Sequence, residues 1–207
     1  PRSLERRGVD LVRTQQVDAL PPDILALTHR DPDVGMDEVG AWQRLIGIVD
    51  DLLNIARLEA GTLAVALEPI DLGTLAREAA AGIEAHAGEA HRFAVEVDPG
   101  ELVVYADPEK LGQVLSALLA NAVGYSPEGG TVTISARRRA DMAEVVVADE
   151  GVGIARADLQ RIFTKFFRAE REGVSVQGSG LGLFLVRGLV TAMGGRIWVE
   201  SDEGHGS

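Results

Sequence analysis

The sequence contains no cysteine, so disulfide bonds, thiol catalysis and cysteine-based zinc sites are excluded. Histidine is also scarce, and the spacing of His29, His86, His91 and His205 does not predict a metal site. No apolar run approaches the roughly 20 residues that span a bilayer, and no signal peptide opens the chain. Because the chain begins at Pro1 instead of Met, we expect a soluble fragment of a longer protein.

Basic residues are few relative to acidic ones. The 207 residues include 20 Lys and Arg against 32 Asp and Glu, which gives a formal net charge of -12. A chain this acidic repels phosphate backbones, so we expect no nucleic-acid partner. With 46% hydrophobic and 25% charged residues, the composition is that of one ordinary folded domain or two small ones.

The first third of the chain has the pattern of helices. Between Val39 and Glu59, apolar residues recur at alternating steps of three and four. These residues are Trp42, Leu45, Val49, Leu52 and Ala56. The pattern is typical of a helical hairpin that forms a four-helix bundle in a dimer, and equally of an amphipathic helix packed on its own domain. Gly61 is a common helix stop, so we predict a helical domain over 1–62 and a second domain over 63–207.

The second domain has short strands and helices without a regular βαβ repeat, which predicts an α+β sandwich with its helices on one face. Asp71 and Asp107 predict the N-caps of two helices. A turn at 98–100 joins two predicted strands, and a hairpin is expected within 131–148. The predicted strands are 62–70, 91–97, 102–106, 131–136, 143–148 and 196–200, and the predicted helices are 71–86, 107–121 and 181–193.

Three features of this domain are compatible with ligand chemistry. Asn121 follows the apolar face of the helix from Asp107, and its carboxamide oxygen suits a hard cation such as Mg²⁺, although a helix cap or an exposed amide is the simpler role. Asp149 follows a predicted strand and precedes Gly151 and Gly153. These glycines let the backbone approach a flat ligand, and the carboxylate can accept from an exocyclic amine, although a plain glycine turn has the same pattern.

The third feature is a glycine-rich segment at the start of a predicted helix. Free N–H groups and the positive end of the helix dipole suit a polyphosphate there. The segment lacks the lysine of a Walker A loop and the glycine spacing of a dinucleotide fingerprint. Its residues are Gly178, Ser179, Gly180, Leu181, Gly182 and Leu183.

In this order, the three features resemble the catalytic, ATP-binding domain of sensor histidine kinases, in the superfamily that also includes DNA gyrase, Hsp90 and MutL. The resemblance covers about residues 61–207. It places the N box at 115–127, the G1 box at 149–154, the F box at 162–168, the G2 box at 178–183 and a last glycine motif at 204–207. The family continues into one more strand, so we expect a domain truncated at that strand. The helix ending at Gly61 resembles the second helix of the family's dimerisation and phosphoacceptor domain.

The resemblance implies an α/β sandwich that binds ATP and Mg²⁺. Asn121 would hold Mg²⁺, and Asp149 would bind the adenine amine. Lys165 and Arg168 would neutralise phosphate charge, with ordinary solvated surface as the alternative. The phenylalanines of the F box are expected to pack the lid against the domain. The other nucleotide-binding positions would be Tyr125, Gly151, Gly153, Ile154, Gly178, Ser179, Gly180, Leu181, Gly182 and Leu183.

Two departures from the family pattern concern the phosphates and the acceptor. Ala117 and Gly124 replace polar residues of the N box, which predicts weaker ATP binding. The family's acceptor motif is a histidine followed by an acid and Leu-Arg-Thr-Pro, and its best match, at 10–15, has Asp10 in the place of the histidine. His29 is the only histidine of the first domain, and it is either the acceptor or a surface residue.

The resemblance as a whole implies the cytoplasmic core of a sensor histidine kinase in a two-component system. It would act as a homodimer, move the γ-phosphoryl of Mg-ATP to a histidine and pass it to the receiver domain of a response regulator. Contact with the inner membrane would come only through segments outside this chain. The alternative is a non-catalytic pseudokinase that binds nucleotide and regulates a partner through its helices. A gyrase- or Hsp90-type ATPase is disfavoured, because Ala117 stands where those enzymes have a glutamate general base.

Overall fold

The computed structural model describes residues 36–100, 102–169 and 179–207. The chain divides into two compact units, Pro1–Leu45 and Ile46–Ser207. The first helix described, α2 (Met36–Glu59), runs across this division, and the features below belong to the second unit. His29 and the acceptor-like stretch 10–15 lie outside the described residues. No helix in the described ranges is long and apolar enough to cross a membrane.

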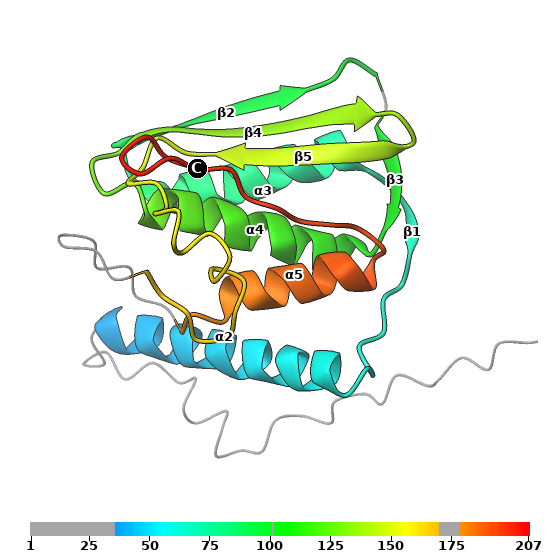
Figure 1. Ribbon diagram of the computed structural model, residues 1–207, viewed down its shortest axis with the longest axis horizontal. Helices are drawn as coiled ribbons and strands as arrows, with labels where there is room; N and C mark the ends of the chain where they lie inside the picture. Colours follow the sequence, from blue (N-terminus) through cyan, green and yellow to red (C-terminus); the bar gives the residue numbers. More distant parts are fainter. Residues whose placement is uncertain (1–35, 101, 170–178) are drawn as a thin grey trace, which may run out of the picture. The chain divides into compact units, whose positions relative to one another are not determined.

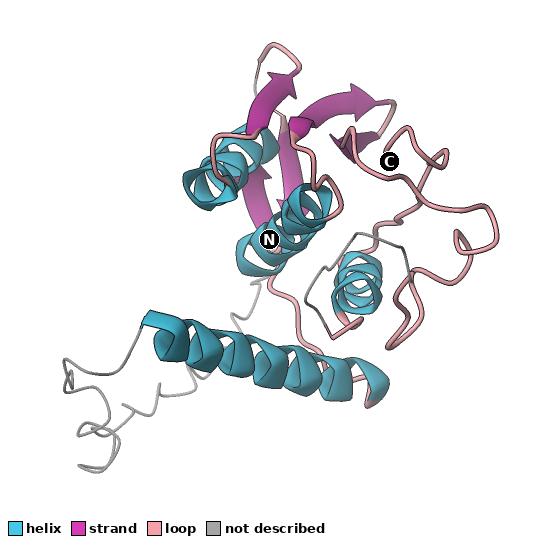
Figure 2. Ribbon diagram, turned by 90° about the vertical axis from the view of Figure 1, so that its left-hand side faces the viewer, coloured by secondary structure: helices cyan, strands magenta, loops and turns pink. Residues whose placement is uncertain are grey.

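The remaining elements form a two-stranded and a three-stranded sheet, and helices cover one face of the larger sheet, so the predicted α+β class is confirmed. Their bounds are β1 Glu68–Asp71, α3 Leu72–Ala87, β2 His91–Val97, β3 Val103–Ala106, α4 Pro108–Gly124, β4 Gly130–Arg139, β5 Met142–Ala148 and α5 Gly182–Ala192. The three-stranded sheet has the order β2-β4-β5, with α3 and α4 on one face, and α5 packs against α4 (Figure 1). Figure 2 shows this layering with the strands in magenta and the helices in cyan.

The predicted N-caps are confirmed, and one of them also anchors the segment before β1. Asp71 caps α3 by accepting a hydrogen bond from the Gly73 N–H at 3.2 Å, and Asp107 caps α4 by accepting from the Lys110 N–H at 3.1 Å. Asp107 is only 8% exposed, and its second carboxylate oxygen accepts from the Ala66 N–H at 2.9 Å. The hydrogen bond from Ala66, helped by that from Lys110, lowers the pKa of the Asp107 carboxyl below its usual value.

The strand pairing differs in part from what local patterns indicate. The hairpin of β4 and β5 is confirmed. The turn at 98–100 connects β2 to β3, but β2 pairs in parallel with β4, whereas β3 pairs antiparallel with β1. The predicted strand at 196–200 is wrong, because these residues join no ladder of the described chain. Of the predicted strand at 62–70, only residues 68–70 lie in a strand, where they form part of β1.

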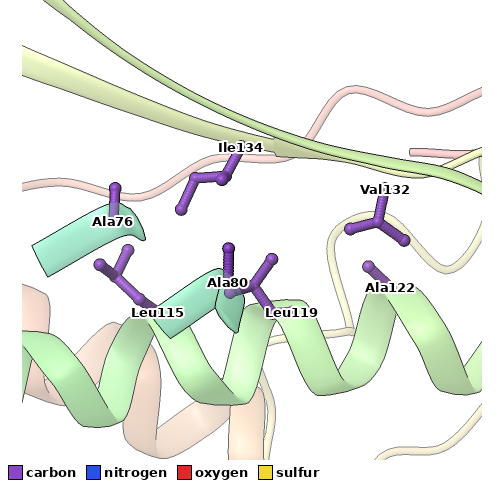
Figure 3. Close-up of a cluster of buried hydrophobic side chains, with 7 residues drawn as sticks. All are labelled: Ala76, Ala80, Leu115, Leu119, Ala122, Val132 and Ile134. Carbon is purple, nitrogen blue, oxygen red and sulfur yellow. The ribbon is translucent and has the colours of Figure 1, made fainter. Parts of the chain in front are cut away.

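The core that positions the site lies between the sheet and helices α3 and α4 (Figure 3). Small side chains on α3 let this helix come close to its neighbours. The buried residues are Ala76, Ala80, Leu115, Leu119, Ala122, Val132 and Ile134, each at most 4% exposed. Burial of one such leucine or isoleucine side chain contributes about 1.5–3 kcal/mol. This packing fixes α4 against the sheet and thereby places the last turn of α4 at the site.

A second core joins α4, α5 and the end of α2 within the second unit. Its buried members are Ile55, Val114, Leu181, Leu185, Val186 and Leu189. Gly188 of α5 lies directly against Leu58 of α2, whose side chain occupies the space that a Cβ atom would need. The end of α2 is therefore packed on α5.

Candidate functional site

A cavity of about 470 Å³ lies where the end of α4, the end of β5 and the start of α5 meet. The predicted site residues that line it are Asn121, Tyr125, Asp149, Gly153, Ile154, Arg168 and Leu183. They come from the N, G1, F and G2 boxes, which lie far apart in the sequence. The fold therefore brings parts of all four motifs to one cavity.

Asp149 is the first residue after β5, and two hydrogen bonds fix its orientation. Its Oδ1 accepts from the Gly151 N–H at 2.9 Å, and its own N–H donates to the Ser207 carbonyl at 2.8 Å. Burial raises the pKa of the Asp149 carboxyl, and the hydrogen bond from Gly151 opposes this shift in part. A half-buried carboxylate held in this way suits a neutral hydrogen-bond donor such as an amine.

The loop after Asp149 depends on its glycines. A Cβ atom on Gly151 would collide with the Tyr125 carbonyl and would stand 2.7 Å from Asp149 Oδ1. Gly153 has a φ of 63°, in the left-handed region, and a Cβ atom there would collide with the Asp202 carbonyl. The loop is therefore held between the end of α4 and the turn near the C-terminus of the described chain.

The N-box residues project from the last turns of α4. Asn121 and Tyr125 are one helical turn apart, and the Tyr125 N–H donates to the Asn121 carbonyl at 2.9 Å. Both residues line the cavity. Within the described ranges, no group of three His, Cys, Asp or Glu residues is arranged to hold a metal ion. Asn121, the predicted metal ligand, therefore lies at the cavity with its carboxamide as one of several oxygen-bearing side chains there.

The two basic residues of the F box have different surroundings. Arg168 lines the cavity. Lys165 forms an ion pair with Glu59 at the end of α2, and its Nζ lies 5.1 Å from the centre of the Phe184 ring on α5. Lys165 is not among the described residues that line the cavity.

The expectation that all the F-box phenylalanines pack the lid against the domain is wrong for one of them. Phe163 and Phe167 line the cavity, whereas Phe166 is 67% exposed and has a φ of 60°. The Phe166 ring is therefore mostly exposed to solvent. The Phe166 backbone instead contacts Gly180, where a Cβ atom would lie 2.8 Å from the Phe166 carbonyl carbon.

The glycine-rich G2 segment is described from Ser179 onward, and Gly178 lies outside the described residues. The Ser179 Oγ accepts from the Leu181 N–H at 3.3 Å. Leu181 is 1% exposed and belongs to the core, so it can serve a ligand only through its backbone. Helix α5 begins at Gly182, and no described residue caps it with a side-chain hydrogen bond. A helix N-terminus of this kind favours an anion.

The sequence did not predict a cluster of charged side chains that lines another part of the cavity. Arg137 and Arg139 on β4 bind Glu144 on β5 at 2.8 and 3.2 Å. Arg196 and Trp198 also line the cavity, with the guanidinium 5.7 Å from the centre of the ring. Glu144 stands opposite Arg137 in the strand register, so an opposite-charge pair across the predicted hairpin is the signal that locates this group.

Comparison with known proteins identifies the family. Residues 106–207 match the family of histidine kinase-, DNA gyrase B- and HSP90-like ATPases. The chain is 36% identical over 168 residues to the sensor-like histidine kinase SenX3 of Mycobacterium tuberculosis, which covers 79% of this chain and 40% of SenX3. It is 32% identical over 168 residues to the sensor histidine kinase WalK of Bacillus subtilis, which covers 80% of this chain and 28% of WalK. The chain therefore spans less than half the length of these relatives.

Solved structures agree with this result. Full-length ShkA, in a crystal structure with AMPPNP, has a TM-score of 0.69 and 33% identity, over 79% of this chain and 34% of ShkA. The mycobacterial sensor histidine kinase MprB has a TM-score of 0.54 and 30% identity, over 62% of this chain and 81% of the MprB chain. By sequence and by fold, this chain belongs to the sensor histidine kinases, and its residues 106–207 belong to their ATPase-type domain.

Proposed function

We propose that this chain binds Mg-ATP and transfers its γ-phosphoryl group to a histidine, as the core of a sensor histidine kinase. The observation that carries the proposal is one cavity that joins Asn121, Asp149 and the start of α5. An oxygen ligand for the metal, a carboxylate for the base and a helix N-terminus for the phosphates are what a magnesium nucleotide requires. Membership of the histidine kinase family supports the same activity.

The base and the phosphates would contact different parts of the cavity. Asp149 would accept a hydrogen bond from the exocyclic amine of adenine, while Tyr125 and Ile154 would contact the ring. The first N–H groups of α5, from Gly182, would bind phosphate oxygens. Arg168 would offset the charge that develops on the transferring group.

The donor set fits magnesium at Asn121. Mg²⁺ prefers oxygen ligands and keeps several waters, so one carboxamide together with nucleotide phosphates is a sufficient set. A dedicated cluster of acidic ligands is absent from the described ranges, in keeping with a metal that is held mainly by the nucleotide. When bound, the ion offsets negative charge on the phosphates.

We also propose that residues 1–62 are a dimerisation and phosphoacceptor-like segment and that the chain acts as a homodimer. In the second unit, α2 exposes an apolar stripe whose side chains are 40% to 51% exposed. The stripe consists of Ile48, Val49, Leu52 and Leu53. Two of these residues belong to the heptad pattern, which is typical of a helix that pairs with a second copy.

The recipient of the phosphoryl group would be a histidine, and then the receiver domain of a response regulator. In this chain the candidate is His29, and a histidine of another protein is the alternative recipient. ATP is available in the cytoplasm, so the proposal places the domain there, as part of a sensor protein at the inner membrane. The relatives named as sensor histidine kinases support only the assignment to a sensor protein.

The second candidate function is a pseudokinase that binds nucleotide without transferring phosphate. Ala117 favours it, because its side chain packs against the core shared by α4 and α5 and offers no polar group to the phosphates. Gly124, at the end of α4, likewise contributes no charge. The kinase and the pseudokinase would both bind nucleotide at Asp149. They differ in whether the γ-phosphoryl group is transferred to a histidine.

Incubation of the purified chain with γ-labelled Mg-ATP separates the two functions. The kinase should acquire covalent label that is labile in acid and stable in alkali, which indicates phosphohistidine, and His29→Gln should abolish it if this residue is the acceptor. Protein that binds ATP but acquires no label would support the pseudokinase, or a kinase whose histidine is on another protein. Protein that does not bind ATP would contradict both.

A further inference from the structure

His91 is the first residue of β2, and its ring lies between the ends of two helices. Helix α3 ends at Ala87, and the Ala87 carbonyl oxygen is 3.1 Å from His91 Nδ1. Just beyond the end of α4, the Ser126 carbonyl oxygen is 3.0 Å from His91 Nε2. The last carbonyl groups of a helix have no partner within the helix, so a side-chain N–H that reaches them is stabilising. One partly buried side chain therefore joins the ends of α3 and α4.

The contact at Ser126 continues through Tyr125 to the cavity. Tyr125 lines the cavity, and its carbonyl accepts from the Val152 N–H at 3.0 Å. Val152 belongs to the loop that follows Asp149, and this loop also contributes residues to the cavity. The backbone at 125–126 thus holds the loop on one side and contacts His91 on the other.

The turn that begins at Ser126 packs closely on the start of β2. The Ser126 carbonyl also accepts from the Gly129 N–H at 2.9 Å, which closes the turn. Gly129 has a φ of 80°, and a Cβ atom there would collide with the Ala90 carbonyl. The N–H of Gly130 donates to the same Ala90 carbonyl at 3.1 Å, and Gly130 is opposite His91 in the parallel register. The backbone of the turn is therefore anchored on β2, and His91 is the side chain that contacts its first carbonyl.

We propose that His91 is a positioning residue of the nucleotide site. Its Nε2–H donates to the Ser126 carbonyl and so holds Tyr125 and the loop at Val152 in the arrangement that a bound nucleotide requires. His91 is not among the described residues that line the cavity, so it acts through the backbone and does not touch the nucleotide. The inference rests on the proposed function, because it requires the nucleotide to bind in the cavity.

The location of the proton on the ring distinguishes this role from a purely structural one. A neutral imidazole carries one N–H, so it donates either to Ser126 through Nε2 or to Ala87 through Nδ1, whereas a protonated ring donates to both. A histidine that only caps α3 would carry its proton on Nδ1. The proposed role requires a proton on Nε2.

Two substitutions separate the two contacts of the ring. The amide nitrogen of asparagine is two bonds from Cβ, as Nδ1 is in histidine, so His91→Asn retains a donor toward Ala87 and loses the one toward Ser126. The amide nitrogen of glutamine is three bonds from Cβ, as Nε2 is in histidine, so His91→Gln retains the donor toward Ser126. Each variant keeps one of the two contacts, which makes the pair matched in stability.

The test measures the dissociation constant of Mg-ATP by titration calorimetry and the melting temperature of the nucleotide-free protein. We expect His91→Asn to bind Mg-ATP about three- to tenfold more weakly than the wild type, which is the effect of one lost hydrogen bond. His91→Gln should bind within about twofold of the wild type. The melting temperatures of the two variants should agree within about 2 °C. Nitrogen-15 NMR of the wild type should show a proton on Nε2, with the His91 signal assigned by its absence in His91→Asn.

Equal Mg-ATP affinities of the two variants would overturn the inference, because a purely structural histidine treats both contacts alike. An affinity loss that follows the loss of melting temperature would overturn it too, as would a wild-type Nε2 without a proton. The NMR measurement on the wild type gives a decision even where a variant does not fold. Wild-type protein that binds no Mg-ATP would overturn the proposed function itself, and the inference with it.

Discussion

Lys165, in the F box, forms an ion pair with Glu59, the last residue of α2. The Lys165 Nζ also lies 5.1 Å from the centre of the Phe184 ring on α5. A basic residue expected to act on phosphate is thus held by a carboxylate and an aromatic ring, while Arg168 lines the cavity. The contact connects the proposed dimerisation helix directly with the F box, whose neighbouring residues line the cavity.

Glu59→Gln should therefore strengthen ATP binding about two- to fivefold at low ionic strength. The substitution removes the carboxylate that competes with phosphate for Lys165. The ion pair is partly exposed and contributes at most about 1 kcal/mol, so the melting temperature should change little. Calorimetric titration at low and high salt measures the effect, which should disappear at high salt.

Glu84→Gln, at an exposed position on α3, removes the same charge and is the control for this experiment. Equal strengthening in both variants would indicate a general effect of net charge. Weaker ATP binding by Glu59→Gln alone would show that Glu59 positions Lys165 instead of competing for it.

Asp149→Asn should weaken ATP binding about tenfold or more, because the single acceptor oxygen of the carboxamide cannot serve both the Gly151 N–H and the amine of the base. Burial raises the pKa of the Asp149 carboxyl above its unfolded value, so the folded wild type loses stability as pH rises through the titration of this group. The variant carries no charge there. Its free energy of unfolding should rise relative to the wild type between about pH 4 and pH 7. Urea unfolding at both pH values checks the sign, and an unchanged dissociation constant for ATP would show that Asp149 does not bind the base.

Local sequence signals located most elements of the second unit. An N-cap is a local hydrogen bond, so Asp71 and Asp107 marked the starts of α3 and α4 correctly. Alternation also located β2, whose bounds agree with the prediction. Which strands pair depends, however, on contacts between segments that are distant in the sequence. The turn at 98–100 therefore did not predict that β2 pairs in parallel with β4.

Only those residues of the candidate site that lie in recognisable sequence motifs could be predicted. Asn121 and Asp149 stand at the ends of elements, and the structure brings both to the cavity. His91 gave no signal, because its contact with the Ser126 carbonyl joins segments that are distant in the sequence. The ion pair of Lys165 with Glu59 was likewise invisible, since it joins residues on different elements.

Gly151→Ala should destabilise the protein by about 1–3 kcal/mol and weaken ATP binding. The added methyl group would collide with the Tyr125 carbonyl and press on Ser126 Oγ and Asp149 Oδ1. Gly82→Ala is the control, because Gly82 lies within α3 with no atom near the position of its Cβ, and this change should stabilise the protein by up to about 1 kcal/mol. Urea unfolding measures both variants, and a Gly151→Ala protein as stable as the wild type would contradict the packing described here.

Asp107→Ala should lower the free energy of unfolding at pH 7 by about 1–2 kcal/mol, because it removes an N-cap and leaves the Ala66 N–H without its acceptor. The hydrogen bonds to Asp107 lower the pKa of its carboxyl, so its contribution is present above the unfolded pKa, near about 3.9, and is lost as pH falls through the folded value. The difference between the wild type and the variant should therefore shrink on acidification. A constant difference from pH 7 to pH 3 would rule out this account of Asp107.

Leu52→Glu should weaken dimerisation about tenfold or more, because a two-fold interface would bury the new carboxylate twice. Leu52 is 45% exposed in the second unit, so the substitution should not unfold the domain. Leu67→Glu is the matched control, since Leu67 is 51% exposed but lies outside α2. Sedimentation equilibrium should give a dimer for the wild type and for Leu67→Glu, and a monomer for Leu52→Glu at the same concentration. A Leu52→Glu protein that dimerises normally would place the interface elsewhere, whereas a wild type that stays monomeric at every concentration would refute the homodimer itself.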